Sequence, residues 1–195
     1  RQFPQGFSMT SSGMVPINVA TSNEVVTSQI RSLSGSILAV FLMLVLIFRS
    51  VSRGLMGMIP LVFTVLFNFG VMGFFGVHLD IGTALVSSIV IGIGVDYSIH
   101  YLSRMFSEIT QGADLQDAIA STVRRSGKAI TSNAVTVGFG FLALGVSEFL
   151  PLVTLSWMIW LTLNISALAT MILLPALALT IPNVLKLGPS ENKKY

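Results

Sequence analysis

The 195-residue sequence contains no cysteine, and only 10% of its residues are charged. The absence of cysteine excludes a disulfide framework and any thiolate metal site. Soluble domains carry charged side chains at about 25% of their positions, so the shortage of charge argues against a soluble domain. Hydrophobic residues instead make up 53% of the chain. Because they are gathered in long uncharged runs, they predict an integral membrane protein.

Five uncharged runs predict the membrane-crossing segments, since a helix needs about 20 apolar residues to cross the hydrocarbon core. The last run is long enough to cross with a tilt, or to be broken near Pro175. We therefore predict an all-α integral membrane protein with a five-helix transmembrane bundle within residues 33–182. The runs cover residues 33–48, 54–77, 81–102, 129–147 and 152–182.

The distribution of lysine and arginine predicts the orientation of this bundle. The net charge of +3 does not indicate nucleic-acid binding, because the cations lie beside the apolar runs. The alternate loops contain His78, Asp80 and Glu148 and neither lysine nor arginine. The positive-inside rule therefore places the N-terminus outside and the basic tail, residues 183–195, in the cytoplasm. The cationic loops and the tail contain Arg49, Arg53, Arg104, Arg124, Arg125, Lys128, Lys186, Lys193 and Lys194.

The segment between the third and fourth runs, residues 103–128, is predicted to be a cytoplasmic connector helix that Asp114 can cap. Its apolar stripe favours either an amphipathic helix on the membrane face or a solvated connector. The stripe consists of Leu115, Ala118, Ile119 and Val123.

Residues 1–32 differ in composition from the rest and are predicted to be the end of an external α/β domain. The stretch "FSMTSSGMVPINVAT" has a strand-like composition, with turn signals at Gly13 and Pro16. The following "SNEVVTSQIRSL" predicts a helix that leads into the first run. Because the chain begins at Arg1 and only the tail of this domain is visible, we expect the sequence to be a fragment.

Asp96 is the most informative single residue, because it lies within an otherwise apolar run. A carboxylate near the bilayer centre costs roughly 2.5–3.5 kcal/mol on insertion scales. The cost falls if the carboxyl group faces protein or water, or binds a proton. Asp96 is therefore predicted to be either a proton-carrying group or a structural carboxyl that is hydrogen-bonded to a neighbouring helix.

Several neighbours of Asp96 share its helix face or lie next to it. Ser88, Gly92, Asp96 and His100 recur every four residues, so they lie on one face of the third helix. Gly92 permits another helix to approach, and Ser88 can add a polar contact. Tyr97 can pass on a hydrogen bond, and His100 titrates near neutrality. His100 is either the next group in a proton relay or a hydrogen-bonded histidine near the membrane interface.

The fourth run adds polar groups that could reach Asp96 from another helix. Asn133 and Thr136 lie three positions apart, so they share a face and could donate to Asp96 or bond within their own helix. Gly138 and Gly140 are predicted to allow close helix packing. The isolated Asn68 and Asn164 are predicted to form hydrogen bonds between helices; their positions, in the second and fifth runs, suit that role.

The remaining residues predict no cofactor and no metal site, and no catalytic arrangement emerges, so the chain is not expected to be an enzyme. The glycines of "GIG" at 92–94 lie inside a membrane run and lack the spacing of a nucleotide loop. His78 and Asp80 are too few to predict a metal centre.

The motif Gly92-x-x-x-Asp96-Tyr97, in "GIGVDYSIHYLSRM", resembles the fourth or tenth transmembrane helix of the resistance-nodulation-cell division (RND) superfamily. The resemblance is to the branch that contains the MMPL exporters and the Patched and sterol-sensing-domain proteins. It extends over nearly the whole chain. The supporting stretches are "ITSNAVTVGFGFLAL", "SEFLPL", "LLPALAL" and "SNEVVTSQIRSL".

This resemblance implies a fold and a function. The chain would correspond to helices 2–6 of one RND half, the C-terminal half, preceded by the end of the external domain. Asp96 and Tyr97 would match the proton-carrying pair, and a second half would supply the partner pair. The implied function is proton-driven export of lipids or other hydrophobic molecules from a bacterial or archaeal cell. The implied partners are membrane lipids, a hydrophobic substrate, and a second copy of the chain or another RND half.

The alternative function is a sterol-sensing-like module that binds a lipid between its helices and regulates without transport of its own. In that case Asp96 would be a structural polar contact. The two hypotheses differ in whether a proton gradient drives a flux that depends on Asp96.

Overall fold

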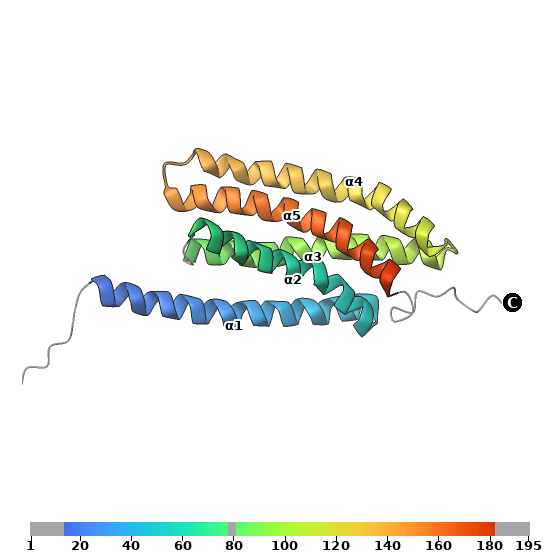
Figure 1. The fold of residues 1–195 in the computed structure, drawn as a ribbon, viewed down its shortest axis with the longest axis horizontal. Coiled ribbons are helices and arrows are strands. Elements are labelled where there is room, and N and C mark those ends of the chain that lie inside the picture. The colour runs from blue at the N-terminus through green and yellow to red at the C-terminus, as the bar shows by residue number, and fades with distance from the viewer. Residues whose placement is uncertain (1–13, 78–80, 182–195) are drawn as a thin grey trace, which may run out of the picture.

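The computed structural model describes the backbone of residues 14–77 and 81–181, and the side chains of these residues except 14–25, 81–82 and 84–85. This part of the chain is all-α, as predicted, and contains no strand. Five long helices lie side by side along one common direction (Figure 1). They are α1 (Met14–Phe48), α2 (Val51–Phe75), α3 (Ile81–Thr110), α4 (Leu115–Leu142) and α5 (Leu150–Thr180), with the short 3₁₀ helix η1 (Ala143–Val146) after α4.

Within the residues whose side chains the structure describes, four segments are long and apolar enough to cross a membrane, which confirms a multi-pass membrane bundle. α3 is described in full only from Val86 onward, and its central turns carry Asp96, Tyr97 and His100. It is the helix in the middle of the bundle, because it contacts each of the other four (Figure 1). The four segments are Val26–Phe48, Val51–Phe75, Leu115–Val146 and Leu150–Thr180.

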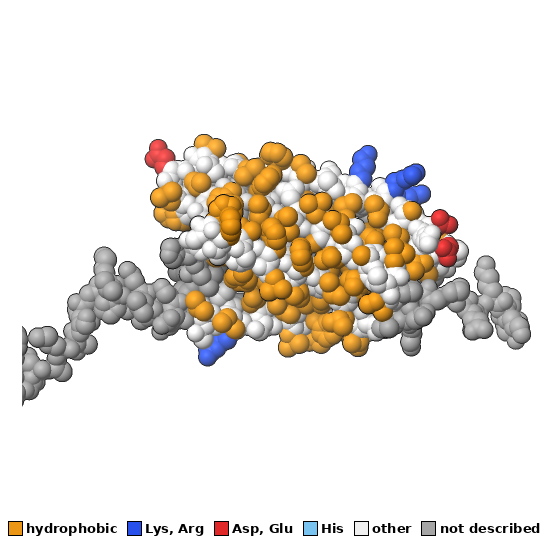
Figure 2. Space-filling model, viewed as in Figure 1, with side chains coloured by type: hydrophobic (Ala, Val, Ile, Leu, Met, Phe, Trp, Pro, Cys, Tyr) orange, Lys and Arg blue, Asp and Glu red, His pale blue; other side chains and the backbone are white. Residues whose placement is uncertain are grey.

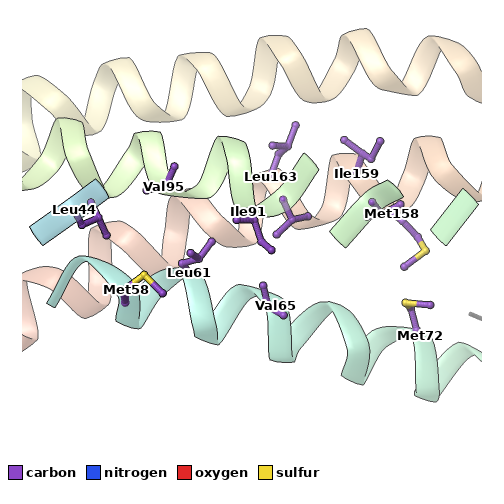
Figure 3. Packing of buried hydrophobic residues seen from close by; sticks show 12 residues of the cluster. Leu44, Met58, Leu61, Val65, Met72, Ile91, Val95, Met158, Ile159 and Leu163 are labelled. Atoms are coloured by element: carbon purple, nitrogen blue, oxygen red, sulfur yellow. The ribbon is translucent and has the colours of Figure 1, made fainter. Parts of the chain in front are cut away.

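Two hydrophobic clusters hold the helices together. The first lies toward the α2–α3 turn and joins α1, α2, α3 and α5, with Leu61, Ile91 and Leu163 at its centre (Figure 3). The second lies toward the α3–α4 turn and joins α2, α3, α4 and α5 through residues such as Met56, Tyr101 and Leu174. α1 contributes little to either cluster, since only 6% of its apolar window is buried. The core therefore lies between α2, α3, α4 and α5.

The two internal prolines do not break their helices. Pro60 lies within α2 and Pro175 within α5, and both helices continue through them. The predicted alternative of a fifth span broken near Pro175 is therefore wrong. α2 ends instead at Gly76, whose left-handed φ of 65° lets its N–H donate to the Met72 carbonyl.

The N-terminal segment differs from its sequence-based expectation. The strand-like composition was expected to extend to Thr21, but the described backbone is helical from Met14 onward. Pro16 is compatible with this, because it occupies the first turn, where its missing N–H has no helical partner. The first part of the expected strand, residues 7–13, lies outside the described residues.

The predicted connector, residues 103–128, is also organised differently. It is not one helix but the end of α3 and the beginning of α4, joined by a turn at residues 111–114 with Gly112 at φ 95°. The apolar stripe of α4 contacts other helices rather than a membrane surface, since Ala118 and Ile119 are buried in the cluster with Met105. The Glu108 carboxylate ties the hairpin together by accepting a hydrogen bond from Ser121 across the turn (3.1 Å).

Candidate functional site

Asp96 lies on a face of α3 that the other helices leave uncovered. Ser88, Gly92, Asp96 and His100 are all exposed, and they follow one another at intervals of one helical turn. Asp96 is flanked on α3 by the buried Val95 and Tyr97, which point into the bundle. The site is therefore at the surface of this chain and not in its core.

A pocket of about 310 Å³ opens on this face between α3 and α4. It brings together Asp96, Tyr97 and His100 with Asn133, all four of which were predicted as site residues. No lysine or arginine lines it, so His100 is the one lining side chain that can carry a positive charge. The lining consists of Asp96, Tyr97 and His100 from α3 and Ser126, Ala129, Ile130 and Asn133 from α4.

Tyr97 connects the pocket to the bundle core. Its side chain is only 2% exposed and belongs to the cluster with Tyr101 and Ala134. Its hydroxyl lies beside Asn133 and close enough to Asp96 to interact with the carboxylate electrostatically. The hydroxyl is buried and has no well-formed hydrogen bond within the described part of the chain, so Asn133 or a water molecule in the pocket can be its partner.

Asp96 and His100 line the same pocket, but no direct hydrogen bond or ion pair between them is found in the described structure. They lie one helical turn apart, which corresponds to about 6 Å along the axis. A proton moving from one to the other would therefore pass through water or through the Tyr97 hydroxyl. The pocket can hold such water because its walls carry carboxylate, imidazole, hydroxyl and amide groups.

Two predicted polar contacts lie outside the pocket. Thr136 and Ser88 are exposed, but neither belongs to the pocket lining. Thr136 lies almost one turn beyond Asn133 along α4, and Ser88 lies two turns from Asp96 along α3. Distance along the helices therefore separates both from the carboxylate.

The predicted packing glycines behave in two different ways. Gly138 is buried against α5, where an added methyl group would lie 3.0 Å from Trp160 Cδ1. Gly92 and Gly140 are exposed, and an added methyl group would have no atom of another segment within 4 Å. No helix of the described chain therefore packs against Gly92 or Gly140, and their predicted role in helix packing stays a prediction.

The two isolated asparagines also differ. Asn68 Oδ1 lies 3.1 Å from the Thr162 hydroxyl, which links α2 to α5 as predicted, although the hydroxyl shares its one proton with the Met158 carbonyl of α5 at 2.6 Å. Asn164 instead donates to the Trp160 carbonyl of its own helix (2.8 Å). This second bond corrects the expectation of a link between helices at Asn164, because a carbonyl one turn away in α5 is already within reach.

Sequence reasoning missed Ser126, Ala129 and Ile130 as lining residues. The missing signal was available in the helical period, since these residues precede Asn133 by seven, four and three positions. Ser126 was assigned to the connector, whereas Ala129 and Ile130 were apolar residues at the start of the fourth run and carried no polar signal of their own. The continuous α4 places them on the same side as Asn133.

Comparison with known proteins gives a consistent result. The family model described as "MMPL family" matches residues 11–194. A putative membrane protein of Methanocaldococcus jannaschii, MJ1562, is 27% identical over 175 residues, covering 90% of this chain and 45% of that protein. The probable trehalose monomycolate exporter MmpL3 of Mycobacterium leprae is 28% identical over 190 residues, covering 94% of this chain and 20% of the exporter.

A third relative matches over a shorter range. The sulfolipid-1 exporter MmpL8 of Mycobacterium tuberculosis is 32% identical over 92 residues, covering 47% of this chain and 8% of the exporter. The chain thus spans less than half the length of each of these three relatives.

Proposed function

Since the chain belongs to the MMPL family of membrane transporters, we propose that it is the membrane half of a proton-motive-force-driven exporter of lipids or other hydrophobic molecules. The observation that carries the proposal is Asp96, a carboxyl group on the uncovered face of the central helix, beside a polar pocket. The relatives named as a probable trehalose monomycolate exporter and a sulfolipid-1 exporter support the class of substrate.

Proton coupling follows from the free energy of the Asp96 carboxylate in two surroundings. A charged carboxylate in contact with hydrocarbon costs several kcal/mol, whereas a protonated one costs much less. When water fills the pocket, the charged form is favoured, and when the pocket closes, the protonated form is favoured. A conformational change that opens and closes the pocket would therefore take up and release a proton, with Tyr97 and His100 as relay groups.

The proposal requires a partner for the face that carries Asp96. An intramembrane carboxylate that faces lipid is unfavourable, so these residues generally face other helices or water. We propose that a second RND half, or a second copy of this chain, covers the face. The open space beside Gly92 and Gly140 supports this, because small residues let helices approach closely.

The proposed orientation follows from the cations at one end of the bundle. Arg49 and Arg53 flank the α1–α2 turn, and Arg104 and Lys128 lie near the α3–α4 turn. The positive-inside rule would place this end in the cytoplasm of a bacterial or archaeal cell, with the N-terminus outside. The pocket would then open toward the cytoplasmic side of Asp96, through His100.

The decisive experiment replaces Asp96 by Asn in the full-length protein and measures gradient-driven export in proteoliposomes. Asn keeps the size and polarity but cannot take up a proton, so we expect export to lose its dependence on the proton gradient. Asp117→Asn is the matched control, because it removes the same charge from an exposed carboxylate of α4 that does not line the pocket. Expression and assembly of both variants are checked by size-exclusion chromatography.

The relay residues allow a graded test with the same assay. Tyr97→Phe removes only the hydroxyl, and His100→Gln removes the titrating group, so each should slow export without abolishing it. If the Asp96→Asn variant exported at the rate of the wild type and kept the same dependence on the proton gradient, proton coupling at this site would be ruled out. A tightly bound lipid with no gradient-dependent flux would instead support the sterol-sensing-like alternative.

A further inference from the structure

A second charged feature lies on α4, away from the pocket. Arg124, Arg125 and Lys128 are all exposed, and none forms an ion pair with any residue that the structure describes. The described ion pair at this end of the bundle joins Arg104 to Glu108 within α3. In Figure 2 blue side chains project from the α4 edge at the upper right, next to red ones at the tip, and other blue atoms lie on the opposite edge. Because these three cations have no ion-pair partner among the described residues, they are free to attract an anion.

Two of these cations belong to a column of exposed residues along α4, which we call the α4 outer face, and its later members are uncharged. It consists of Arg125, Lys128, Ser132, Val135 and Phe139, spaced three, four, three and four positions apart. This spacing keeps all five on one side of the helix. Phe139 is 62% exposed and Val135 39% exposed. At 1.5 Å per residue, the cations and Phe139 are separated by roughly 16 to 21 Å along the axis.

The order of groups along the α4 outer face matches the order of groups in a phospholipid. Two cations come first, one turn later the Ser132 hydroxyl follows, and the apolar Val135 and Phe139 come last. A phosphate, a glycerol ester and an acyl chain follow one another over a comparable distance. The binding of a free anion would require neither the hydroxyl nor the exposed phenylalanine, so the column favours a lipid over a free phosphate.

We propose that the α4 outer face binds one anionic phospholipid, with its phosphate on Arg125 and Lys128 and one acyl chain along Phe139. Arg124, the third cation, adds to the positive potential beside the headgroup. A zwitterionic lipid is disfavoured because its ammonium group would meet the same three cations. The arginine guanidinium supports the assignment, since its planar donors match two phosphate oxygens.

The bound lipid would act on the pocket through α4. Asn133 is the neighbour of Ser132 along the helix and projects into the pocket on another side of α4. A lipid held at the headgroup by Arg125 and Lys128 would fix the depth and rotation of this helix in the membrane. It would thereby fix one wall of the pocket, whatever reaction or transport the pocket serves.

The test measures lipid binding by the full-length protein in detergent by native mass spectrometry. Phosphatidylglycerol and phosphatidylcholine are titrated against the wild type and against Arg125→Gln/Lys128→Gln. We expect phosphatidylglycerol to bind more tightly to the wild type, and about fivefold less tightly for each cation removed. Arg49→Gln is the matched control, because Arg49 is an exposed cation at the same end of the bundle but on the α1–α2 turn.

Two further arms separate a lipid from an ion. Inorganic phosphate at equal concentration should not displace phosphatidylglycerol, and Phe139→Ala should weaken lipid binding without changing the charge of the protein. Equal affinity of the double variant and the wild type for phosphatidylglycerol would overturn the proposal. The proposal would also be overturned if inorganic phosphate displaced phosphatidylglycerol and Phe139→Ala had no effect on lipid binding. In that case the cations would form a site for a free anion.

A second measurement covers the case in which the double variant does not fold. The chain has no cysteine, so Ser132→Cys provides a single site for a fluorescent label. Brominated phosphatidylglycerol should quench this label more strongly than brominated phosphatidylcholine in mixed bilayers of equal bromine content. Equal quenching by the two lipids would contradict a specific site at the α4 outer face.

Discussion

The contact between α1 and α2 at Gly54 allows a quantitative prediction of how a substitution there changes the stability of the bundle. Gly54 lies in the first turn of α2, and a methyl group added there would lie 2.7 Å from Val45 Cγ2. It would also lie 3.1 Å from the Val45 nitrogen and 3.3 Å from its Cα. A side-chain atom can rotate away, but the backbone of α1 cannot move without shifting the helix. We therefore expect Gly54→Ala to force the two helices apart.

The loss of stability caused by Gly54→Ala can be estimated by comparison with a second glycine of the same helix. Gly70 also lies within α2, but a methyl group added there would have no atom of another segment within 4 Å. Both substitutions gain the higher helix propensity of alanine, about 1 kcal/mol. Only Gly54→Ala adds an overpacking cost, typically 1–3 kcal/mol. The propensity gain cancels in the difference, so Gly54→Ala should be about 1–3 kcal/mol less stable than Gly70→Ala.

The assay is reversible unfolding of the purified protein in mixed micelles with increasing dodecyl sulfate, followed by circular dichroism. The free energy of unfolding is compared for the wild type, Gly54→Ala and Gly70→Ala under one set of conditions. Gly70→Ala should be as stable as the wild type or slightly more stable. Equal free energies for the two variants would refute the reasoning, because the α1–α2 contact would then have to be looser than the structure describes.

Two further predictions use the same unfolding assay. Thr162→Val removes a hydroxyl that bonds both to Asn68 of α2 and to the Met158 carbonyl of its own helix. Thr64→Val is the control, because its hydroxyl bonds only within α2, so Thr162→Val should destabilise by about 0.6–1.7 kcal/mol more. Equal effects would contradict a stabilising link between α2 and α5. Gly92→Leu should leave the free energy of unfolding of the single chain unchanged, because the position is open, yet it should weaken association with a second half. Gly35→Leu, at an open position of α1, is the control. Equal association of the two variants would argue against a partner at the Asp96 face.

The membrane helices could be predicted from the sequence, but their ends could not. Long uncharged runs give the number and order of the helices because hydrocarbon excludes charge. They do not report where helical backbone continues into water. α3 extends to Thr110, eight residues beyond its apolar run, because its polar end is covered by the beginning of α4. That coverage depends on two helices together, so no single segment could reveal it.

The candidate site was predictable to the extent that it depends on one helix. The charge of Asp96 and the turn-by-turn spacing of Gly92 and His100 identify their shared face directly. The contribution of α4 depends on the rotation of that helix, which is set by its contact with α5. Gly127 lies against Met171 there, and an added methyl group would lie 2.6 Å from Met171 Cε. This rotation brings Asn133 into the pocket.

The glycines of α3 and α4 fall into two groups that describe the two sides of the molecule. Gly94 and Gly138 face other helices, where an added methyl group would lie 3.1 Å from Leu61 Cδ1 and 3.0 Å from Trp160 Cδ1, respectively. Gly92 and Gly140 face outward, with no atom of another segment within 4 Å. Glycine in a helix costs stability relative to alanine, so its use is explained where a neighbour approaches closely. The contacts within this chain explain the inner pair. The outer pair lies on the same face as Asp96, and a helix from a second half that approaches there would account for both the glycines and the carboxylate.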